Sequence, residues 1–155
     1  MTAAQVWTGT EFADHFVFDF DGDRFDFVLG GHGDDYIADG ADDGLWSSDV
    51  YRGKQGNDTI VSLDGHDELR GGKGDDVFEL TLGFFDPSQT PGAPYDGEPA
   101  EIGFDVDIRG GQGFDRLVIH NSEGYTLETD GNALIIHSIW GGTVTVRGVE
   151  DISFL

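Results

Sequence analysis

Apolar side chains recur at nine-residue intervals along much of this 155-residue chain. When the chain is divided into windows of nine, the eighth position is apolar or aromatic in each, at Phe16, Val28, Ile37, Tyr51, Ile60, Leu69, Phe78 and Leu117. Against a background of 37% apolar residues, such agreement would arise by chance roughly once in a few thousand trials. A window this short predicts a turn followed by a short strand whose middle residue points inward, rather than a helical repeat.

Glycine and aspartate also hold fixed places in these windows. Residues 30–38, 71–79 and 110–118 fit the pattern G-G-x-G-x-D-x-U-x, in which U is apolar. Residues 44–79 contain four contiguous windows with Asp at the sixth position, and looser copies lie at 9–17 and 21–29. Two windows make one coil, so we expect an all-β fold, a right-handed parallel β-roll, or β-solenoid.

The roll should occupy residues 1–118, with a Pro-containing loop at 80–109 interrupting it. All four Pro lie within residues 87–99, and the alternation at 104–108 predicts a strand that returns to the roll. Three aromatic residues of the loop, Phe84, Phe85 and Tyr95, are expected to pack over the roll, the alternative being a partner site.

Residues 119–155 change period and predict a short antiparallel β cap at the C-terminus. A hairpin is expected from 125–129 and 133–137 around an Asp130-Gly131 turn, with further strands at 143–146 and 152–155. Such a cap would cover the open end of the solenoid, where backbone groups lack partners.

The net charge makes a cation the natural complement of this chain. It carries 31 Asp and Glu against 8 Lys and Arg, a formal charge of −23 at pH 7. This charge opposes a compact state unless it is neutralised, yet 37% apolar residues are too many for a disordered tail. Nucleic acids and acidic membrane surfaces are poor partners, and a thiolate metal site is excluded because the chain has no Cys.

The spacing of Gly and Asp favours calcium in particular. Paired Gly permit positive φ and bring carbonyls together, and Ca²⁺ takes about six to eight oxygen ligands from carboxylates and carbonyls. Windows two apart lie on the same edge of a roll, so an ion can lie between the Asp of successive coils. Alternation places Asp26, Asp49 and Asp67 on one edge and Asp14, Asp35, Asp58 and Asp76 on the other, with Asp115 extending one edge after the loop.

The expected ligands are these Asp together with the Gly that shape their turns. They are Asp14, Asp26, Gly31, Gly33, Asp35, Asp49, Gly53, Gly56, Asp58, Gly65, Asp67, Gly72, Gly74, Asp76, Gly111, Gly113 and Asp115. About three to six ions are expected, first between Asp58 and Asp76, Asp49 and Asp67, and Asp35 and Asp58. The alternative is that these Asp only stabilise Asx turns beside Gly.

The nonapeptides resemble the RTX (repeats-in-toxin) family of secreted bacterial proteins. The resemblance covers residues 9–79 and 110–118. It implies a calcium-bound parallel β-roll, type I secretion through an uncleaved C-terminal signal, and folding triggered by calcium outside the cell. Residues 150–155, acidic and then apolar, are similar to such a signal, although a last core strand would look the same.

Several windows depart from the family pattern. Lys54 replaces the second Gly of its window, Ser62 and Leu63 replace both leading Gly, and Arg24 stands where a Gly is expected. The window that begins at Gly44 keeps only one leading Gly. Sites built on these turns are expected to be weak, incomplete or empty.

Basic and imidazole side chains suggest two further sites. Arg52 and Arg70 lie 18 residues apart at the ninth position, so they should stack in one column that Arg109 continues. This column could bind an anionic polysaccharide, as RTX-type modules of alginate epimerases do, or it could pair with Glu68 and nearby Asp. His32 and His66 could hold a transition metal, but we expect them to be solvated and on different edges.

We therefore expect a non-enzymatic, calcium-folded, secreted bacterial module. No nucleophile elbow, zinc-protease motif or phosphate loop is present, and no apolar run reaches the length of a membrane span. Residues 1–15 lack the features of a cleaved signal peptide, so an export signal should lie elsewhere. The expected partners are calcium, the type I secretion machinery and, in the alternative interpretation, a carbohydrate or cell surface bound as an auxiliary module of a larger enzyme or adhesin.

Overall fold

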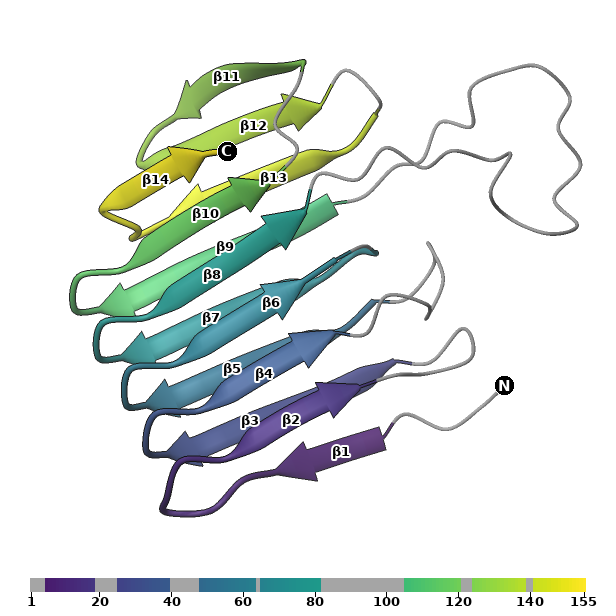
Figure 1. Ribbon diagram of the computed structural model, residues 1–155. Coiled ribbons are helices and arrows are strands. Elements are labelled where there is room, and N and C mark those ends of the chain that lie inside the picture. The colour runs from purple at the N-terminus through teal and green to yellow at the C-terminus, as the bar shows by residue number, and fades with distance from the viewer. Residues whose placement is uncertain are drawn as a thin grey trace, which may run out of the picture.

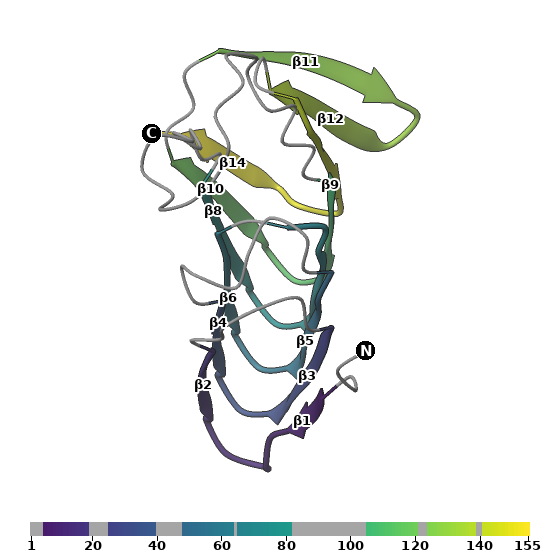
Figure 2. The ribbon, with the colours of Figure 1, turned by 90° about the vertical axis from the view of Figure 1, so that its right-hand side faces the viewer.

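The chain forms two β-sheets that face each other across a narrow core (Figures 1 and 2). The computed structural model describes residues 5–18, 25–39, 48–63, 65–81, 105–120, 124–138 and 141–155. All the regular structure in these residues is β-strand. None of them belongs to a helix of the length and hydropathy that a membrane span requires. The expected all-β class and parallel sheets are confirmed.

The first sheet has eight strands in the order β1-β3-β5-β7-β9-β13-β12-β11. Its strands are β1 (Gln5–Thr8), β3 (Asp26–His32), β5 (Val50–Gln55), β7 (Glu68–Lys73), β9 (Asp105–Gln112), β11 (Tyr125–Asp130), β12 (Ala133–Ser138) and β13 (Thr143–Arg147). From β1 to β13 every neighbouring pair is parallel. The antiparallel pairs are β11 with β12 and β12 with β13.

The second sheet has six strands in the order β14-β10-β8-β6-β4-β2. Its strands are β2 (His15–Phe18), β4 (Tyr36–Asp39), β6 (Thr59–Ser62), β8 (Val77–Thr81), β10 (Arg116–His120) and β14 (Asp151–Phe154). All its pairs are parallel. Each coil of the roll therefore contributes one strand to each sheet, as two nonapeptides per coil require.

The turns between the sheets form two edges. We call the edge where β1, β3, β5, β7, β9 and β13 lead into β2, β4, β6, β8, β10 and β14 the first edge. The second edge is the opposite one, where β2, β4 and β6 end and β3, β5 and β7 begin. The first-edge turns are stacked like rungs along the side of the roll in Figure 1.

Two stacked columns of inward side chains run through the core. In the first sheet the column runs through Trp7, Val28, Tyr51, Leu69, Ile108 and Val146, which are in register. In the second sheet it runs through Phe16, Ile37, Ile60, Phe78, Leu117 and Ile152. The residues in the middle of both columns are fully buried. The apolar eighth position of each nonapeptide is therefore the core position.

The antiparallel cap is smaller than the sequence predicted. We expected antiparallel strands across residues 119–155, but β13 pairs in parallel with β9, and β14 pairs in parallel with β10. These two strands form one more coil of the roll. The reason is that Val146 and Ile152 continue the apolar columns and Val144 is buried in register with Val106, which is favourable whether or not the nonapeptide motif is present.

The remaining cap is the β11–β12 hairpin. Asp130 pairs with Ala133, so the two-residue loop is Gly131-Asn132 rather than the predicted Asp130-Gly131. Gly131 has φ of +62°, which suits glycine at the first central position of a tight hairpin turn. The rings of Tyr125 and Phe154 stack with centroids 4.4 Å apart and thereby join the hairpin to the last coil.

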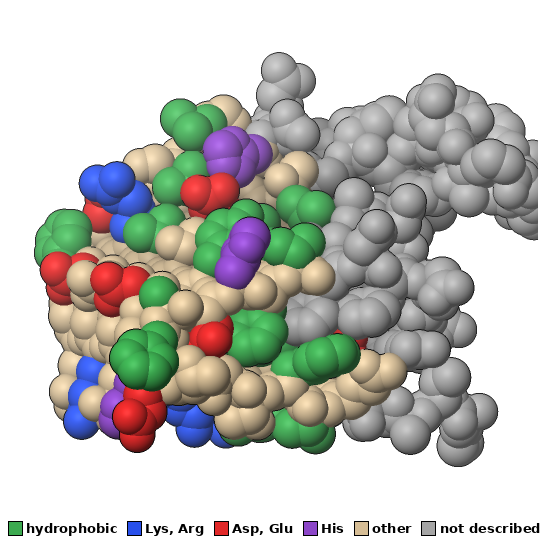
Figure 3. All heavy atoms as spheres, turned by 60° about the horizontal axis from the view of Figure 1, so that its bottom comes forward, with side chains coloured by type: hydrophobic (Ala, Val, Ile, Leu, Met, Phe, Trp, Pro, Cys, Tyr) green, Lys and Arg blue, Asp and Glu red, His purple; other side chains and the backbone are tan. Residues whose placement is uncertain are grey.

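The N-terminal end of the roll presents hydrophobic side chains. Trp7 is 38% exposed although it heads a core column. Val6, Phe12, Val17 and Phe25 are also exposed, and Figure 3 shows hydrophobic side chains on this end of the molecule. The predicted loop with its four Pro, and Phe84, Phe85 and Tyr95 with it, lies outside the described residues; the returning strand is part of β9.

Candidate metal centre

The first edge carries a continuous ladder of aspartates. The backbone N–H of Asp14 donates to Oδ1 of Asp35 (2.8 Å), and the N–H of Asp35 donates to Oδ1 of Asp58 (2.9 Å). The same bond joins Asp58 to Asp76 and Asp76 to Asp115, each at 2.9 Å. The ladder follows from the parallel register, because it places the sixth position of every nonapeptide at the same height. Asp115 extends this edge.

The second carboxylate oxygen of four ladder aspartates has no protein partner. Oδ2 of Asp35, Asp58, Asp76 and Asp115 is buried and accepts no hydrogen bond. These residues are at most 2% exposed. A buried ionised oxygen without a donor is costly, so this arrangement requires either a proton or a cation.

Each of these oxygens lies over the first glycine of its own nonapeptide. A Cβ on Gly30 would overlap Oδ2 of Asp35, and it would also lie 2.7 Å from the carbonyl oxygen of Gly53 in the next coil. A Cβ on Gly53 or Gly71 would overlap Oδ2 of Asp58 or Asp76 in the same way. The glycines thus leave room for a carboxylate oxygen and, at Gly30, a carbonyl oxygen to approach the same point.

Burial raises the pKa of all four carboxyl groups. The pKa of Asp58 rises to about 6, chiefly through desolvation, while the hydrogen bond from the Asp35 backbone lowers it and the charges of Asp35 and Asp34 raise it. Desolvation raises the pKa of Asp76 to about 7 against the hydrogen bond from Asp58. The pKa values of Asp35 and Asp115 are raised for the same main reason. The ladder therefore favours neutralisation of its charge.

The turns of this edge need left-handed backbone at two positions. At the second position φ is +120° at Gly31, +126° at Gly72 and +127° at Gly111, and Lys54 adopts the same region with φ of +90°. Lys54 is the non-glycine residue with positive φ in the described part of the chain. At the fourth position, Gly33, Gly56, Gly74 and Gly113 all have positive φ. The pattern substitution at Lys54 is thus accommodated with backbone strain rather than with a different turn.

The first turn of the ladder differs from the others. Oδ2 of Asp14 accepts hydrogen bonds from the backbone N–H of Thr10 and from its hydroxyl group, the latter at 2.9 Å. Thr10 stands where the second Gly of the pattern would be. The protein therefore supplies donors to Asp14 that the other ladder aspartates lack.

The second edge carries a shorter ladder with different partners. The N–H of Asp26 donates to Oδ1 of Asp49 (2.7 Å), and the N–H of Asp49 donates to Oδ1 of Asp67 (3.0 Å). Oδ2 of Asp67 accepts from the hydroxyl of Ser62 at 2.7 Å, and Oδ2 of Asp49 accepts from the hydroxyl of Tyr51 at 3.3 Å. Gly65 has φ of +89° in this edge. The predicted sorting of the aspartates into two edges agrees with these ladders.

A second acidic column lies beside the first-edge ladder, at the fifth position of the turns. Asn57 donates its N–H to Oδ1 of Asp34 (2.7 Å), and Asp75 donates its N–H to the side-chain oxygen of Asn57 (2.8 Å). The backbone N–H of Phe114 continues the column by donating a hydrogen bond to Oδ1 of Asp75 (2.8 Å). These exposed side chains bind the backbone of the neighbouring coil, as Oδ1 of the ladder aspartates does.

One residue of the ladder was not predicted from the sequence. Oε2 of Glu150 accepts a 2.8 Å hydrogen bond from the N–H of Asp115. Glu150 thus takes the position that the next aspartate of the ladder would have. The signal that could have revealed it is the Arg-Gly dipeptide, which precedes three predicted turns at Arg52, Arg70 and Arg109 and recurs at Arg147.

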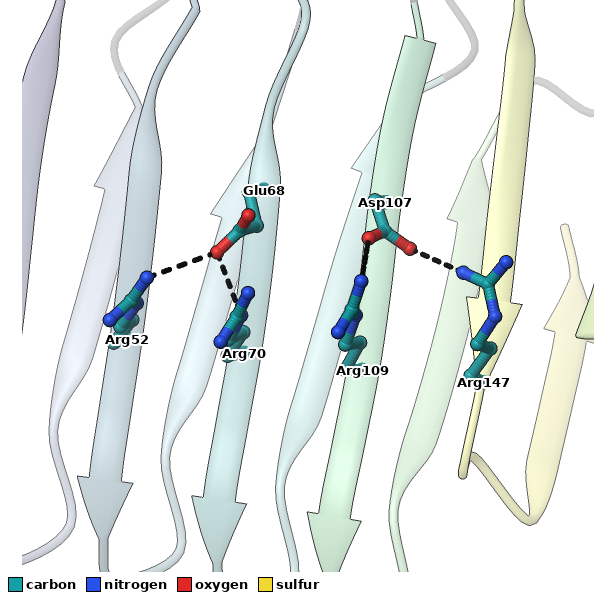
Figure 4. A network of polar contacts seen from close by, with 6 residues as sticks. All are labelled: Arg52, Glu68, Arg70, Asp107, Arg109 and Arg147. Carbon is teal, nitrogen blue, oxygen red and sulfur yellow. Dashed lines mark hydrogen bonds and ion pairs between the residues drawn. The ribbon is translucent and has the colours of Figure 1, made fainter.

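The arginines form one column on the outer face of the first sheet (Figure 4). Arg52, Arg70, Arg109 and Arg147 are in register on β5, β7, β9 and β13. Glu68 pairs with Arg52 (3.2 Å) and Arg70 (2.7 Å). Asp107 pairs with Arg109 (2.9 Å) and Arg147 (2.8 Å). The ion pairing expected as the alternative to polysaccharide binding is therefore present, and Arg147 is an addition to the predicted column.

The two histidines singled out in the sequence do not meet. Nε2 of His32 lies 3.1 Å from the side-chain nitrogen of Gln55, and Nδ1 of His66 lies 3.8 Å from a carboxylate oxygen of Asp105. Within the described ranges, no group of three or more His, Asp or Glu side chains gathers around one point. Carboxylates on the first edge are arranged as pairs along a ladder instead.

Comparison with known proteins agrees with the geometry of the edge. Residues 43–78 match the family model described as the RTX calcium-binding nonapeptide repeat, in four copies. No curated protein matches the chain. RTX repeats imply calcium binding, and the matched segment contains Asp58 and Asp76, two of the four first-edge aspartates whose Oδ2 has no partner. Residues 43–78 of this chain are RTX calcium-binding nonapeptide repeats.

Proposed function

We propose that the chain is a calcium-binding module that folds when ions enter the first edge. The observation that carries the proposal is the set of buried Oδ2 atoms without partners in Asp35, Asp58, Asp76 and Asp115. Three ions would lie between successive turns, joining Asp35 to Asp58, Asp58 to Asp76 and Asp76 to Asp115. Each would neutralise carboxylates that burial alone would force to take up protons.

The residues of this edge fit a hard cation. Ca²⁺ prefers carboxylate and carbonyl oxygens, and Oδ2 of Asp35 approaches the same point as the carbonyl oxygen of Gly53. Since the side chains supply carboxylates in pairs, the other ligands would be carbonyls of the turn, shaped by Gly31, Gly33, Gly56, Gly72, Gly74, Gly111 and Gly113. Gly53 would leave the space for Asp58, as Gly30 does for Asp35.

The same geometry explains why folding should depend on the ion. Stacking the coils brings Asp35, Asp58, Asp76 and Asp115 into one buried line, which costs desolvation and repulsion between like charges. A cation that binds this line only in the folded state stabilises folding by its own binding free energy. We therefore expect a calcium-free chain that is unfolded or loosely packed.

A calorimetric titration of the calcium-free chain with CaCl₂ tests the proposal. At least three ions should bind, with heat that includes folding, and MgCl₂ at the same concentration should give much less because Mg²⁺ demands closer, octahedral geometry. A titration that shows no calcium-dependent heat and no bound ion by equilibrium dialysis would overturn it.

The second edge is a separate part of the proposal. Asp26, Asp49, Gly65 and Asp67 remain predicted ligands, so the total of about three to six ions stands as a prediction. Asp67 and Asp49 already accept hydroxyl hydrogen bonds from Ser62 and Tyr51. We therefore place the first ions on the first edge, and expect the predicted Asp49–Asp67 site to be weaker than the Asp58–Asp76 site.

The biological setting that we propose is the outside of a bacterial cell. RTX repeats are characteristic of secreted bacterial proteins, and calcium-dependent folding suits a chain exported unfolded into a calcium-rich medium. The module would then have a structural or binding role rather than a catalytic one. Expression with and without a type I secretion system, followed by assay of the medium, tests this part.

The second candidate function is docking to an anionic polysaccharide. Four arginines in one column face two carboxylates, Glu68 and Asp107, so the column keeps an excess of positive charge in an acidic chain. Arg52, Arg70 and Arg109 would be the contacts, with Arg147 added. Affinity gels with alginate and with neutral dextran test it; unchanged alginate binding after Arg52→Ala and Arg70→Ala together would overturn it.

A further inference from the structure

The last coil of the roll turns the first edge without the nonapeptide motif. Arg109 pairs with Arg147 and Arg116 pairs with Asp151. Residues 110–115 lie between Arg109 and Arg116, whereas only residues 148–150 lie between Arg147 and Asp151. The turn from β13 to β14 is thus three residues shorter than the preceding one, and it has the sequence Gly-Val-Glu.

Glu150 takes the place of an aspartate in this short turn. Its Oε2 accepts the Asp115 N–H at 2.8 Å, as each ladder aspartate accepts the N–H of the one before it. The N–H groups of Glu150 and Asp151 both donate to the carbonyl of Asp115, at 3.0 and 3.1 Å. The longer side chain of Glu reaches the ladder from a turn that is too short to present an Asp there.

The carbonyl oxygen of Gly148 and Oδ2 of Asp115 converge beside Gly110. A Cβ on Gly110 would overlap both the carbonyl oxygen of Gly148 and Oδ2 of Asp115. Asp115 is fully buried, and this Oδ2 has no hydrogen-bond partner. Gly30 shows the same convergence of an aspartate Oδ2 with the carbonyl oxygen of the next coil. A carboxylate oxygen without a donor that shares one small space with a carbonyl oxygen is suited to a cation.

We infer that Asp115, Gly148 and Glu150 form a fourth calcium site on the first edge, outside the matched repeats. Its protein ligands are Oδ2 of Asp115, the carbonyl oxygen of Gly148 and the Glu150 carboxylate. This inference rests on the proposed function and adds a site that no nonapeptide motif marks. The ion joins β9 and β10 to β13 and β14, so it fastens the C-terminal coil to the roll.

The short turn makes this the weakest site of the edge. The three residues that the β13–β14 turn lacks would otherwise present further carbonyl oxygens, and water would have to replace them. Calcium affinity falls as protein ligands and their charges are removed. Calcium should therefore order the C-terminal coil at a higher concentration than it orders the coils around Asp58 and Asp76.

The test compares the wild-type chain with Glu150→Gln and, as a control, Asp151→Asn in calorimetric titrations with CaCl₂. Gln keeps an oxygen that can accept the Asp115 N–H but loses the charge, whereas Asp151 is half-exposed and pairs with Arg116 (2.9 Å). Glu150→Gln should weaken the last-filled site by about tenfold or more and leave the tighter sites unchanged. Asp151→Asn should titrate like wild type.

A second readout does not depend on the variants. In two-dimensional NMR spectra of ¹⁵N-labelled wild-type chain, the amides of Gly148 and Glu150 should shift together, in the last phase of the titration. If the wild-type chain binds calcium on the first edge but Glu150→Gln binds it identically, or these amides do not respond in a distinct phase, the fourth site is wrong and the proposed function stands. If the wild-type chain binds no calcium, both are wrong.

Discussion

The backbone N–H of Asp58 donates a 2.9 Å hydrogen bond to Oδ1 of Asp76, the equivalent residue one coil further along. Oδ2 of Asp76, fully buried, has no partner. One oxygen of the carboxylate therefore holds the coils together, while the other is costly until a proton or a cation reaches it. The ladder contributes to the fold and also makes the fold conditional.

Replacing Asp76 by Asn separates these two roles. The Asn oxygen can still accept the Asp58 N–H, so in EDTA the variant should be more folded than wild type because it removes a buried charge. In calcium titrations followed by far-UV circular dichroism, the midpoint should rise by about tenfold or more, because one carboxylate ligand is lost.

Asp75→Asn is the matched control for this substitution. Asp75 is exposed and occupies the fifth-position column, where Asn57 already shows that an amide can take the same place. Its calcium midpoint should stay close to that of wild type. If Asp75→Asn and Asp76→Asn shift the midpoint equally, the effect is one of general charge and the ladder has no special part in binding.

The raised pKa values predict opposite pH dependences with and without calcium. The pKa values of Asp58 and Asp76 are about 6 and 7 against 3.8 in the unfolded chain. The calcium-free folded state therefore holds more protons between about pH 4 and pH 7, and its stability falls as pH rises through this window. In saturating calcium the trend should reverse, because protons compete with the ion for the same carboxylates.

Circular dichroism at pH 5 and pH 8, in EDTA and in calcium, measures this dependence. In EDTA the chain should be more folded at pH 5, and in millimolar calcium it should be at least as stable at pH 8. The groups around Asp76 that act with it are Asp58, Asp75 and Asp115. A calcium-free chain that is better folded at pH 8 would contradict the charge account of the ladder.

Lys54→Gly should stabilise the calcium-bound roll. Lys54 has φ of +90°, in the region that glycine occupies in the equivalent turns. Relief of this strain exceeds the entropy that glycine loses on folding, for a net gain of about 0.5–1 kcal/mol in the free energy of unfolding. Lys73→Gly removes the same charge from an exposed position without positive φ, and it should cost about 0.5–1 kcal/mol instead. Urea denaturation in saturating calcium compares the two, and a loss of stability in Lys54→Gly would contradict the strain argument.

Leu117→Ala should destabilise the calcium-saturated chain by about 2–5 kcal/mol, because it leaves a cavity in the core column. Leu117 is fully buried between Phe78 and Ile152 of the neighbouring strands. Val118, next in sequence, is half-buried, so Val118→Ala should cost less than about 1 kcal/mol. Similar losses in urea denaturation would mean that the eighth position is not the core position.

Much of the fold follows from the nine-residue period. Parallel strands in register place equal positions of successive nonapeptides above one another, so the core columns, both aspartate ladders and the column of Arg52, Arg70 and Arg109 could be predicted by counting. The two edges separate because successive nonapeptides belong to opposite sheets. The spacing of residues alone predicts these columns and ladders, because they depend on no long-range pairing other than the stacking of coils.

The remaining features depend on contacts that the motif does not encode. The coil of β13 and β14 has no nonapeptide, and its place follows from apolar residues that extend the columns and from the Arg147-Gly148 dipeptide in register with Arg109-Gly110. Likewise, the hydrogen bonds of Thr10 to Asp14 and of Ser62 to Asp67 arise at positions where the pattern is broken. A departure from the motif predicts a changed site, but only the structure shows which group replaces the missing one.

The central claim, that calcium turns an unfavourable line of carboxylates into a folded edge, is tested most directly by far-UV circular dichroism of the whole chain. In EDTA the spectrum should show little β-structure at neutral pH, and millimolar CaCl₂ should restore a β-sheet spectrum that EDTA reverses. A chain that gives the same β-sheet spectrum and the same urea midpoint with and without calcium would contradict it.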